Sequence, residues 1–370
     1  MNVLTVVLFA VGLILLAVGA NALVRGAAGI AARFGVPPLV IGLTVVAFGT
    51  SSPEVLVSVQ AALAGDPEIA LGNVVGSNIF NVLFILGLSA AITPLVVSER
   101  LVRRDVPIMI GVSLLVYLMS MNGRIGPGEG MLLVAGIIVY VATLVRRVKV
   151  AGEVITEAEI EVAPAARWWV DPAFVLIGLS LQVLGARWLV SGAIAIATTL
   201  GVSELVIGLT VVAAGTSLPE VATSVAASMR GQRDIAVGNV VGSNIFNLLL
   251  VLGIASMVAP SGIEVPEGAL TFDLPIMMAV ALACLPIFVI GYSIRRWEGV
   301  IFLGYYVAYT VFLGLDAANH AAAPVFGDIV VWFVLPLTVI TFIVVTYRTR
   351  RRLGSGPPPG VPRPTPPPPP

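Results

Sequence analysis

The sequence predicts an all-α polytopic membrane protein with two inverted five-helix repeats, which give ten transmembrane helices, plus one extra C-terminal transmembrane helix. Three observations predict this fold: an apolar composition, a series of long apolar stretches, and a repeat within the chain. Of the 370 residues, 58% are hydrophobic and 11% are charged, and the mean hydropathy is +1.05. Soluble domains do not have this composition. Lys and Arg balance Asp and Glu at 20 each, and no basic patch indicates nucleic-acid binding.

Transmembrane helices are predicted from the apolar stretches, because about 20 apolar residues in helical form span the hydrocarbon core. Eleven such stretches follow one another near residues 2–24, 37–63, 69–95, 105–121, 128–145, 172–197, 203–229, 235–259, 272–294, 298–316 and 325–347. The first ends in ANA at 20–22, which is similar to a signal-peptide cleavage site. No basic segment precedes it, and it has a partner later in the chain, so we expect a transmembrane helix instead.

The positions of Lys and Arg predict the orientation, because cytoplasmic loops carry an excess of these residues. With the N-terminus outside and the C-terminus cytoplasmic, nearly all basic residues near helix ends face the cytoplasm; only Arg124 and Arg187 do not. We therefore expect a multi-pass protein of a prokaryotic inner (plasma) membrane. The final LGSGPPPGVPRPTPPPPP cannot form a core, so we expect it to be disordered.

Two segments of the chain, one from Gly35 and one from Gly201, are close copies at a constant offset of 166 residues. From Gly42 to Gly87 about two-thirds of the positions match without a gap, which is too many for chance. Weaker similarity pairs the first helix with the sixth and the fourth with the ninth. The repeating unit therefore has five helices. Because five is odd, the second unit must enter the membrane from the opposite side, as in many secondary transporters.

The repeat divides the chain into five parts. We expect a first repeat at 1–146, a cytoplasmic linker at 147–170, a second repeat at 171–316, an extra helix at 325–347, and a basic then proline-rich tail at 348–370.

Each repeat interrupts its second helix at the same motif, GTSSPE at 49–54 and GTSLPE at 215–220. Proline removes a backbone donor, and the glycine before it relaxes the backbone. We expect the carbonyls of residues 47–50 and 213–216 to be released from helix hydrogen bonds and to take a cation or water instead. Thr50 and Glu54 are four residues apart, as are Thr216 and Glu220, so each pair shares a helix face.

The next helix carries GNVVGSNIFN in both repeats. Ser77 and Asn81 lie four residues apart on one face, and Ser243 and Asn247 repeat this arrangement. Their hydroxyl and amide oxygens are candidate cation ligands, because both pairs recur beside helices that carry a carboxylate. The glycines of the motif form GxxxG patterns, which favour close packing of helices.

The oxygens of these motifs suit Ca²⁺ and Na⁺. Ca²⁺ takes roughly six to eight hard oxygen ligands. Glu54 and Glu220 supply four if each binds through both oxygens, the carbonyls of Thr50 and Thr216 supply two more, and two carboxylates balance a divalent charge. Sulfur and imidazole are missing from the motifs, which argues against zinc, copper or iron. The alternative for the two glutamates is a protonated or hydrogen-bonded pair that only stabilises helix contacts.

Other polar residues have simpler interpretations. Asp105 and Asp273, near the start of the fourth and ninth helices, are expected to be interfacial or capping acids. Cys284 is expected to pack in a helix, and His320 to lie in a loop.

On these motifs, the chain resembles the prokaryotic sodium/calcium exchanger family of the cation/Ca²⁺ antiporter superfamily, over residues 1 to about 316. The resemblance implies ten helices in two inverted halves, with one Ca²⁺ site and several Na⁺ sites between the second, third, seventh and eighth helices. It implies that Ca²⁺ is bound by Glu54, Glu220, Thr50 and Thr216. It implies that Asn81 and Asn247 line the centre and that the Na⁺ sites use Ala47, Ser51, Ser77, Asn81, Ala213, Ser217, Ser243 and Asn247.

The expected function is secondary active antiport of Na⁺ against Ca²⁺ by alternating access, with Ca²⁺ export. This is not an enzyme activity, and we expect no cofactor and no protein partner, only the two ions and the bilayer. Potassium-dependent relatives carry an acid at the position of Asn247, so this residue indicates K⁺-independent exchange. The alternatives are an H⁺/Ca²⁺ exchanger in which Glu54 or Glu220 takes up protons, a cation channel, and a non-transporting membrane scaffold. The channel is disfavoured because the sequence shows neither the ring of acidic residues nor the filter-like loop of a selective pore. The scaffold is disfavoured because it does not explain why the GTSxPE motif occurs twice.

Overall fold

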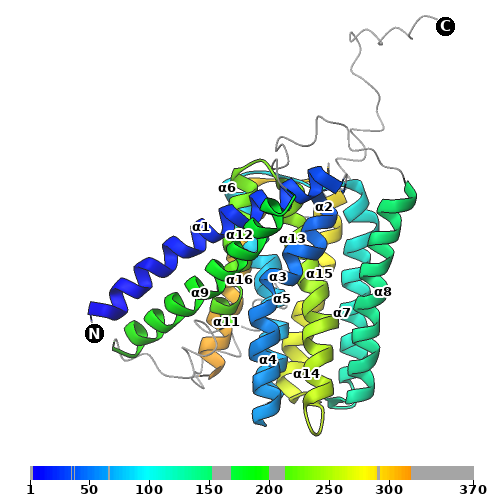
Figure 1. Cartoon of the computed structure of the whole chain (residues 1–370). Coiled ribbons are helices and arrows are strands. Elements are labelled where there is room, and N and C mark those ends of the chain that lie inside the picture. Colours follow the sequence, from blue (N-terminus) through cyan, green and yellow to red (C-terminus); the bar gives the residue numbers. More distant parts are fainter. Residues whose placement is uncertain are drawn as a thin grey trace, which may run out of the picture. The chain divides into compact units, whose positions relative to one another are not determined.

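The computed structural model describes residues 3–34, 36, 38–65, 67–151, 168–199, 213–289 and 292–317, and the structural statements below concern these residues. They form almost only helices (Figure 1). Several predictions lie outside the described residues: the extra helix at 325–347, the tail at 348–370, most of the linker at 147–170, the segment 203–212, and His320.

The first half of the chain contains a long helix, a helix interrupted twice, and three further helical segments. Its elements are α1 (Val3–Phe34), α2 (Pro38–Ile41), η1 (Gly42–Val46), α3 (Ala47–Thr50), α4 (Ser52–Ala64), α5 (Pro67–Phe80), η2 (Asn81–Leu86), α6 (Gly87–Ile92), η3 (Leu101–Asp105), α7 (Val106–Ser120) and α8 (Pro127–Ala151), where η denotes a π-helical turn.

The second half follows the same order where it is described. Its elements are α9 (Val170–Thr199), α11 (Ala213–Thr216), α12 (Leu218–Met229), α13 (Arg233–Phe246), η6 (Asn247–Val251), α14 (Leu252–Val258), η7 (Ala269–Asp273), α15 (Leu274–Val289) and α16 (Arg296–Ala317). Each of the first ten predicted stretches therefore contains helix. The helix predicted at 2–24 is longer than expected, because the small residues of RGAAGIAARF continue α1 along α9.

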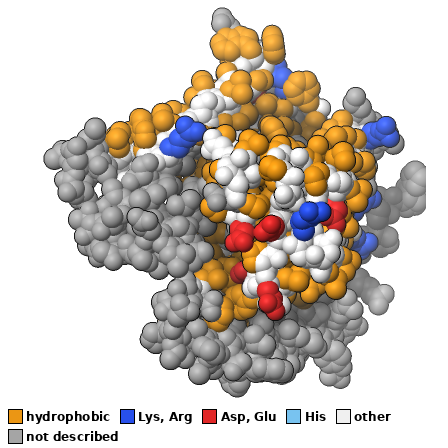
Figure 2. Space-filling model, turned by 90° about the horizontal axis from the view of Figure 1, so that it is seen from below, with side chains coloured by type: hydrophobic (Ala, Val, Ile, Leu, Met, Phe, Trp, Pro, Cys, Tyr) orange, Lys and Arg blue, Asp and Glu red, His pale blue; other side chains and the backbone are white. Residues whose placement is uncertain are grey.

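The helices are suited to a membrane. Within the described residues, six helices are long and apolar enough to cross a bilayer, and one bent pair makes a possible seventh. Large apolar side chains such as Leu63, Ile138 and Leu176 are more than 60% exposed on the helix surfaces. Seen from below, charged side chains gather at the end of the bundle while hydrophobic ones cover most of the described surface (Figure 2). This distribution is the one that lipid around the sides and water at the ends would favour. The predicted count of ten plus one helices stays a prediction.

The predicted helix breaks are confirmed. The segment Leu39–Thr50 and α4 are bent by 43° relative to each other at Ser51. In the second half, Ser217 separates α11 from α12. Pro53 and Pro219 lie in the first turn of the helix that follows each break, where the missing N–H is not needed.

Two short antiparallel pairs connect the halves of the chain. β1 (Leu95–Val96) pairs with β4 (Ser293–Ile294), and β2 (Arg124–Ile125) pairs with β3 (Ile263–Glu264). In each pair a buried apolar residue faces another, Leu95 opposite Ile294 and Ile125 opposite Ile263. Each pair joins one strand from the first half to one from the second.

α1 and α9 lie side by side and lean away from the other helices (Figure 1). Glycines allow this close approach: a Cβ at Gly19 would lie 2.7 Å from the Gly178 carbonyl oxygen, and one at Gly178 would lie 2.7 Å from that of Gly19. Arg33 of α1 also forms an ion pair with Asp171 of α9 at 3.3 Å.

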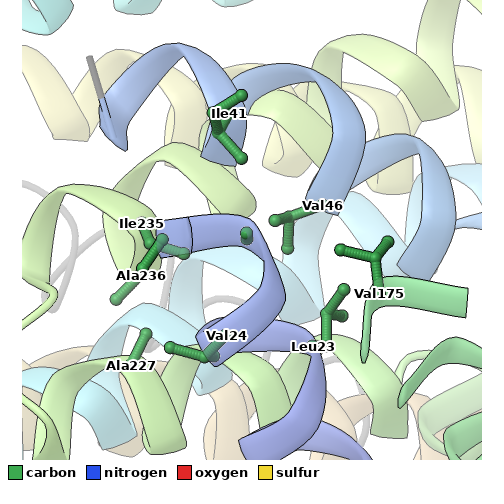
Figure 3. Close-up of a cluster of buried hydrophobic side chains, with 10 residues drawn as sticks. Leu23, Val24, Ile41, Val46, Val175, Ala227, Ile235 and Ala236 are labelled. Carbon is green, nitrogen blue, oxygen red and sulfur yellow. The ribbon is translucent and has the colours of Figure 1, made fainter. Parts of the chain in front are cut away.

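A buried hydrophobic cluster joins α1 and α9 to the bundle (Figure 3). It contains side chains from α1, α2, η1, α9, α12 and α13: Leu23, Val24, Ile41, Val46, Val175, Ala227, Ile235 and Ala236. The interrupted helix of the first half is thus packed between the α1–α9 pair and α13, and this packing positions the break.

Candidate cation site

Glu54 and Glu220 lie in the first turns of α4 and α12, directly after the two breaks. Both side chains are 0% exposed. A helix N-terminus carries a partial positive charge, so each break offers a favourable position to its own carboxylate. The two carboxylates are close enough to interact electrostatically, and two like charges in a buried place repel each other. Such a pair requires a proton or a cation to compensate for its charge.

Each carboxylate accepts a hydrogen bond from a serine of the other half. Ser51 Oγ donates to Glu220 Oε1 at 3.1 Å, and Ser217 Oγ donates to Glu54 Oε1 at 2.9 Å. The two bonds are equivalent under the offset of 166 residues. The other oxygen, Oε2, of each glutamate is buried and has no hydrogen-bond partner within the described part of the chain. One oxygen of each carboxylate is therefore held by protein, and the other is available to a ligand.

The polar pairs on the next helices add buried oxygens. Ser77 Oγ lies 3.1 Å from Ser217 Oγ, and Ser243 lies beside the Glu220 carboxylate. Asn81 and Asn247 each begin a π-helical turn, η2 and η6, and both are 0% exposed. Turns of this kind are rare and often occur at functional sites.

The two central asparagines differ in their contacts. Asn81 Nδ2 donates to Asn244 Oδ1 at 3.0 Å. Asn81 Oδ1 has no partner among the described residues, nor does either polar atom of the Asn247 side chain. Buried amides without partners are costly, so these atoms also indicate a ligand.

Thr50 and Thr216 direct their hydroxyls toward asparagines of the other half. Thr50 Oγ1 donates to Asn239 Oδ1 at 3.1 Å, and Thr216 Oγ1 donates to Asn73 Oδ1 at 3.2 Å. The predicted ligand atom of each threonine is its main-chain carbonyl, and the hydroxyl bonds do not occupy it.

Asn73 and Asn239 were missed by the sequence reasoning, as were Ser58 and Ser224, which bond to them. A signal was present: all four residues are identical to their partners at the offset of 166 residues, and the asparagines stand in the GN of GNVVGSNIFN. They lie away from the GTSxPE motif in sequence, so spacing alone did not connect them with it.

Ala47 differs from expectation. Its carbonyl accepts the Ser51 N–H at 3.0 Å, so the prediction that the break releases this carbonyl is wrong. The reason is geometric: Pro53 removes the donor that would reach four residues back, to the carbonyl of Gly49. That carbonyl accepts the Ser52 hydroxyl instead. A role of Ala47 in a Na⁺ site stays a prediction. Ala213 begins α11, and its side chain lies outside the described set.

The aspartates lie apart from the site. Asp105 is 1% exposed and accepts the Tyr140 hydroxyl at 3.3 Å, while Asp273 accepts the Tyr309 hydroxyl at 2.9 Å. The prediction of a capping acid is wrong for Asp105, because this residue stands at the N-cap position of α7 without a capping hydrogen bond from its side chain. Its position at the membrane interface stays a prediction. Both aspartates instead connect neighbouring helices.

The chemistry of the site is that of hard oxygens. Among the described residues, no group of three or more His, Cys, Asp and Glu side chains is placed to hold a metal ion. Two carboxylates, hydroxyls, amides and carbonyls remain. Such ligands suit Ca²⁺ and Na⁺ and do not suit thiophilic metals.

Comparison with known proteins agrees with this chemistry. A family model described as sodium/calcium exchanger protein matches residues 4–146 and 171–315. The chain belongs to the sodium/calcium exchanger family. The sodium/calcium exchanger MaX1 of Methanosarcina acetivorans is 33% identical over 339 residues, covering 82% of this chain and 96% of that protein. The inner membrane protein YrbG of Escherichia coli is 37% identical over 284 residues, covering 75% and 87%.

The structure leads to the same family. A solved structure of the sodium-calcium exchanger NCX_Mj, soaked with Na⁺ and Ca²⁺, matches with a TM-score of 0.72 and 32% identity over 83% of this chain and 97% of that one. Members of the sodium/calcium exchanger family are secondary transporters and not enzymes. This family member is therefore a transmembrane cation antiporter, and Ca²⁺ and Na⁺ are the ions of its family.

Proposed function

We propose that this protein exchanges Na⁺ for Ca²⁺ by alternating access, without K⁺, and exports Ca²⁺ from a prokaryotic cell. It lies in the inner membrane with its N-terminus outside and its C-terminus in the cytoplasm. The observation that carries the proposal is the pair of buried glutamates, each with one oxygen held by a serine of the other half and one oxygen without a partner.

Ca²⁺ binds between the two breaks. Glu54 and Glu220 supply the charge, and the carbonyls of Thr50 and Thr216 complete the inner ligands. Two carboxylates neutralise one divalent ion, so a filled site removes the repulsion between them.

Na⁺ binds at flanking positions that overlap this site. The ligands proposed here provide only hydroxyl, amide and carbonyl oxygens besides the shared glutamates, which suits a monovalent ion. They are Ala47, Ser51, Ser77, Asn81, Ala213, Ser217, Ser243 and Asn247. Ser51 and Ser217, which are proposed Na⁺ ligands, are hydrogen-bonded to the glutamates proposed to bind Ca²⁺. The two kinds of site therefore share oxygens, and Na⁺ and Ca²⁺ compete for them.

Coupling follows from the cost of burial. An empty or half-filled site leaves buried carboxylates uncompensated, which is unfavourable on the order of several kcal/mol. The protein therefore changes access only with Ca²⁺ or with enough Na⁺ bound. The α1–α9 pair, whose two helices pack closely along each other, is the element proposed to move. The other helices form the stationary part around the site.

The test is uptake of radioactive Ca²⁺ into sealed proteoliposomes loaded with Na⁺, compared with liposomes loaded with K⁺. Internal Na⁺ is expected to drive uptake and K⁺ is not. Glu54→Gln is expected to lower uptake by about a hundredfold or more, because one of the two charges that hold Ca²⁺ is lost. Glu68→Gln is the matched control, since Glu68 is an exposed acid at the start of α5. Uptake by Glu54→Gln at the wild-type rate would overturn the proposed site.

The same liposomes distinguish the H⁺/Ca²⁺ alternative. The unpartnered carboxylate oxygens of Glu54 and Glu220 would also accept protons, and this observation supports the alternative. Uptake that follows an imposed pH gradient and ignores Na⁺ would establish H⁺ coupling and contradict Na⁺ coupling.

A further inference from the structure

We propose that Asn73 and Asn239 are positioning residues that connect the Ca²⁺ ligands of one half of the site to those of the other. The inference rests on the proposed function, because it concerns the same site. Neither asparagine is needed as an ion ligand. Each one instead joins a threonine of one half to the glutamate-bearing turn of the other half.

Asn239 makes the first connection. Its Oδ1 accepts a hydrogen bond from Thr50 Oγ1 of the first half at 3.1 Å. Its Nδ2 donates to the main-chain oxygen of Glu220 at 3.4 Å and to Ser224 Oγ at 2.9 Å, both in the second half. The side chain is 0% exposed, so water does not compete for these bonds.

Asn73 makes the equivalent connection in the opposite direction. Its Oδ1 accepts from Thr216 Oγ1 of the second half at 3.2 Å. Its Nδ2 donates to the main-chain oxygen of Glu54 at 3.3 Å and to Ser58 Oγ at 3.0 Å. The two networks have the same five atoms in the same roles, which two unrelated packing contacts would not show.

The geometry has a consequence for the ions. A threonine held by its hydroxyl has its main chain, and so its carbonyl, held in orientation. A glutamate whose own carbonyl is bonded has the first turn of its helix held in place. Through Asn239, a displacement of Thr50 is therefore transmitted to the turn that carries Glu220. Through Asn73, a displacement of Thr216 reaches the turn that carries Glu54.

The chemistry requires an amide at these positions. An aspartate offers acceptors only, so it would lose both donor bonds of Asn73 and add a third buried negative charge. The side chain of alanine offers neither donor nor acceptor. The network thus predicts that both asparagines determine how well the two halves bind one ion together.

The test is a double-mutant cycle on Asn73→Ala and Thr216→Val, measured as the apparent KM for Ca²⁺ and the maximal rate of Na⁺-driven uptake. Valine keeps the shape and the main-chain carbonyl of threonine. Each single change is expected to raise the KM by about tenfold, because a buried group loses its partner, and to change the maximal rate by less than about threefold. Together they are expected to raise the KM by little more than one change alone, because both remove the same bond.

Asn73→Ala with Thr50→Val is the matched control, because Thr50 bonds to Asn239 and not to Asn73. In this double mutant the two tenfold effects on the KM are expected to multiply to about a hundredfold, as they do for independent sites. Thr216→Ser, which keeps the hydroxyl, is expected to restore the wild-type KM. The inference would be overturned if the KM effects multiplied fully in both double mutants. It would also be overturned if the variants lowered the maximal rate and left the KM unchanged.

Calorimetric titration of the purified variants with Ca²⁺ separates this inference from the proposed function. If wild type binds Ca²⁺ but does not exchange it for Na⁺, the proposed function fails while the cycle still measures the coupling through Ca²⁺ affinity. If Asn73→Ala does not fold, the Ca²⁺ affinities of Thr216→Val and Thr216→Ser are compared instead. An affinity that falls in both variants would show that the hydroxyl bond is not the cause, and would contradict the inference.

Discussion

At the scale of single residues, the main feature of the site is a set of buried polar atoms that have no hydrogen-bond partner among the described residues. Glu54 and Glu220 each leave one oxygen without a protein partner, and Asn247 leaves both polar atoms of its amide without one among the described residues. A buried polar atom without a partner costs about 1–3 kcal/mol. A bound cation would offset this cost, and these atoms therefore support the cation site proposed above.

Asn247→Asp tests the central position. The change adds a third carboxylate to a buried centre, and its charge requires a further cation. We expect K⁺ added with Ca²⁺ outside the liposomes to raise Ca²⁺ uptake by this variant roughly fivefold, since relieving a buried like charge is worth on the order of 1 kcal/mol. K⁺ is expected to leave wild-type uptake unchanged. Stimulation of wild type by K⁺ would show that K⁺-independent exchange is the wrong assignment.

At the scale of elements, the helix breaks and the glycines have different roles: the breaks position the glutamates, and the glycines allow helices to pack closely. The breaks at Ser51 and Ser217 create two helix N-termini inside the chain, each with a buried glutamate in its first turn. Gly49 shows a second task for glycine, because a Cβ there would lie 2.6 Å from a methyl carbon of Leu179 on α9. A larger residue at this position, two residues before the break, would therefore require the Leu179 side chain to move.

Gly19→Ala tests the packing of α1 on α9. The added methyl group would lie 2.7 Å from the Gly178 carbonyl oxygen, so the helices must move apart. We expect a loss of about 1–3 kcal/mol of stability, measured as a lower melting temperature in detergent. Gly111→Ala in α7 is the control, because a Cβ there meets nothing within 4 Å in the described structure. An equal melting temperature for both variants would contradict the close contact between α1 and α9.

At the scale of the whole molecule, contacts between the halves occur in equivalent pairs. The serine–glutamate bonds, the threonine–asparagine bonds and the two strand pairs each join a residue of the first half to one of the second. These contacts hold the central helices as one body. The α1–α9 pair contacts this body through the hydrophobic cluster and, among the described residues, through polar bonds that include Gln182 to Thr223 and Arg230 to Asn21. In the proposed function this pair is the part that moves.

Cysteine cross-links test which parts move. Val96→Cys with Ser293→Cys places thiols opposite each other on β1 and β4, about 4.5–5.5 Å apart at Cα, which suits a disulfide. We expect this disulfide to form and to leave Na⁺-driven Ca²⁺ uptake within about twofold of the reduced protein, because both strands belong to the stationary part.

The comparison is a bridge from α1 to the bundle. Arg230 donates to Asn21 of α1 at 2.8 Å, so Asn21→Cys with Arg230→Cys can be joined by a thiol-reactive cross-linker. We expect this bridge to stop uptake. Uptake that continues with the second bridge and stops with the first would reverse the assignment of moving and stationary parts.

Much of the fold could be predicted because its signals are local. Apolar stretches located the helices, and GTSSPE and GTSLPE located both breaks, since proline acts on the residue four positions before it. The rule does not extend to Ala47, which lies two residues before Gly49 and whose carbonyl remains bonded. The burial of Asp105 was not predicted either, because a carboxylate near a helix start gives the same pattern whether it faces water or Tyr140.

By itself, the sequence determined the membrane class, the repeat, the breaks, the pair of glutamates and the family to which the chain belongs. These depend on composition and on residues close together in the chain. Only the tertiary structure decided that Ser51 bonds to Glu220 and Ser217 to Glu54, and that Asn73 and Asn239 join the two halves. A hydrogen bond between residues more than a hundred positions apart depends on how the halves pack, and no local pattern encodes that distance.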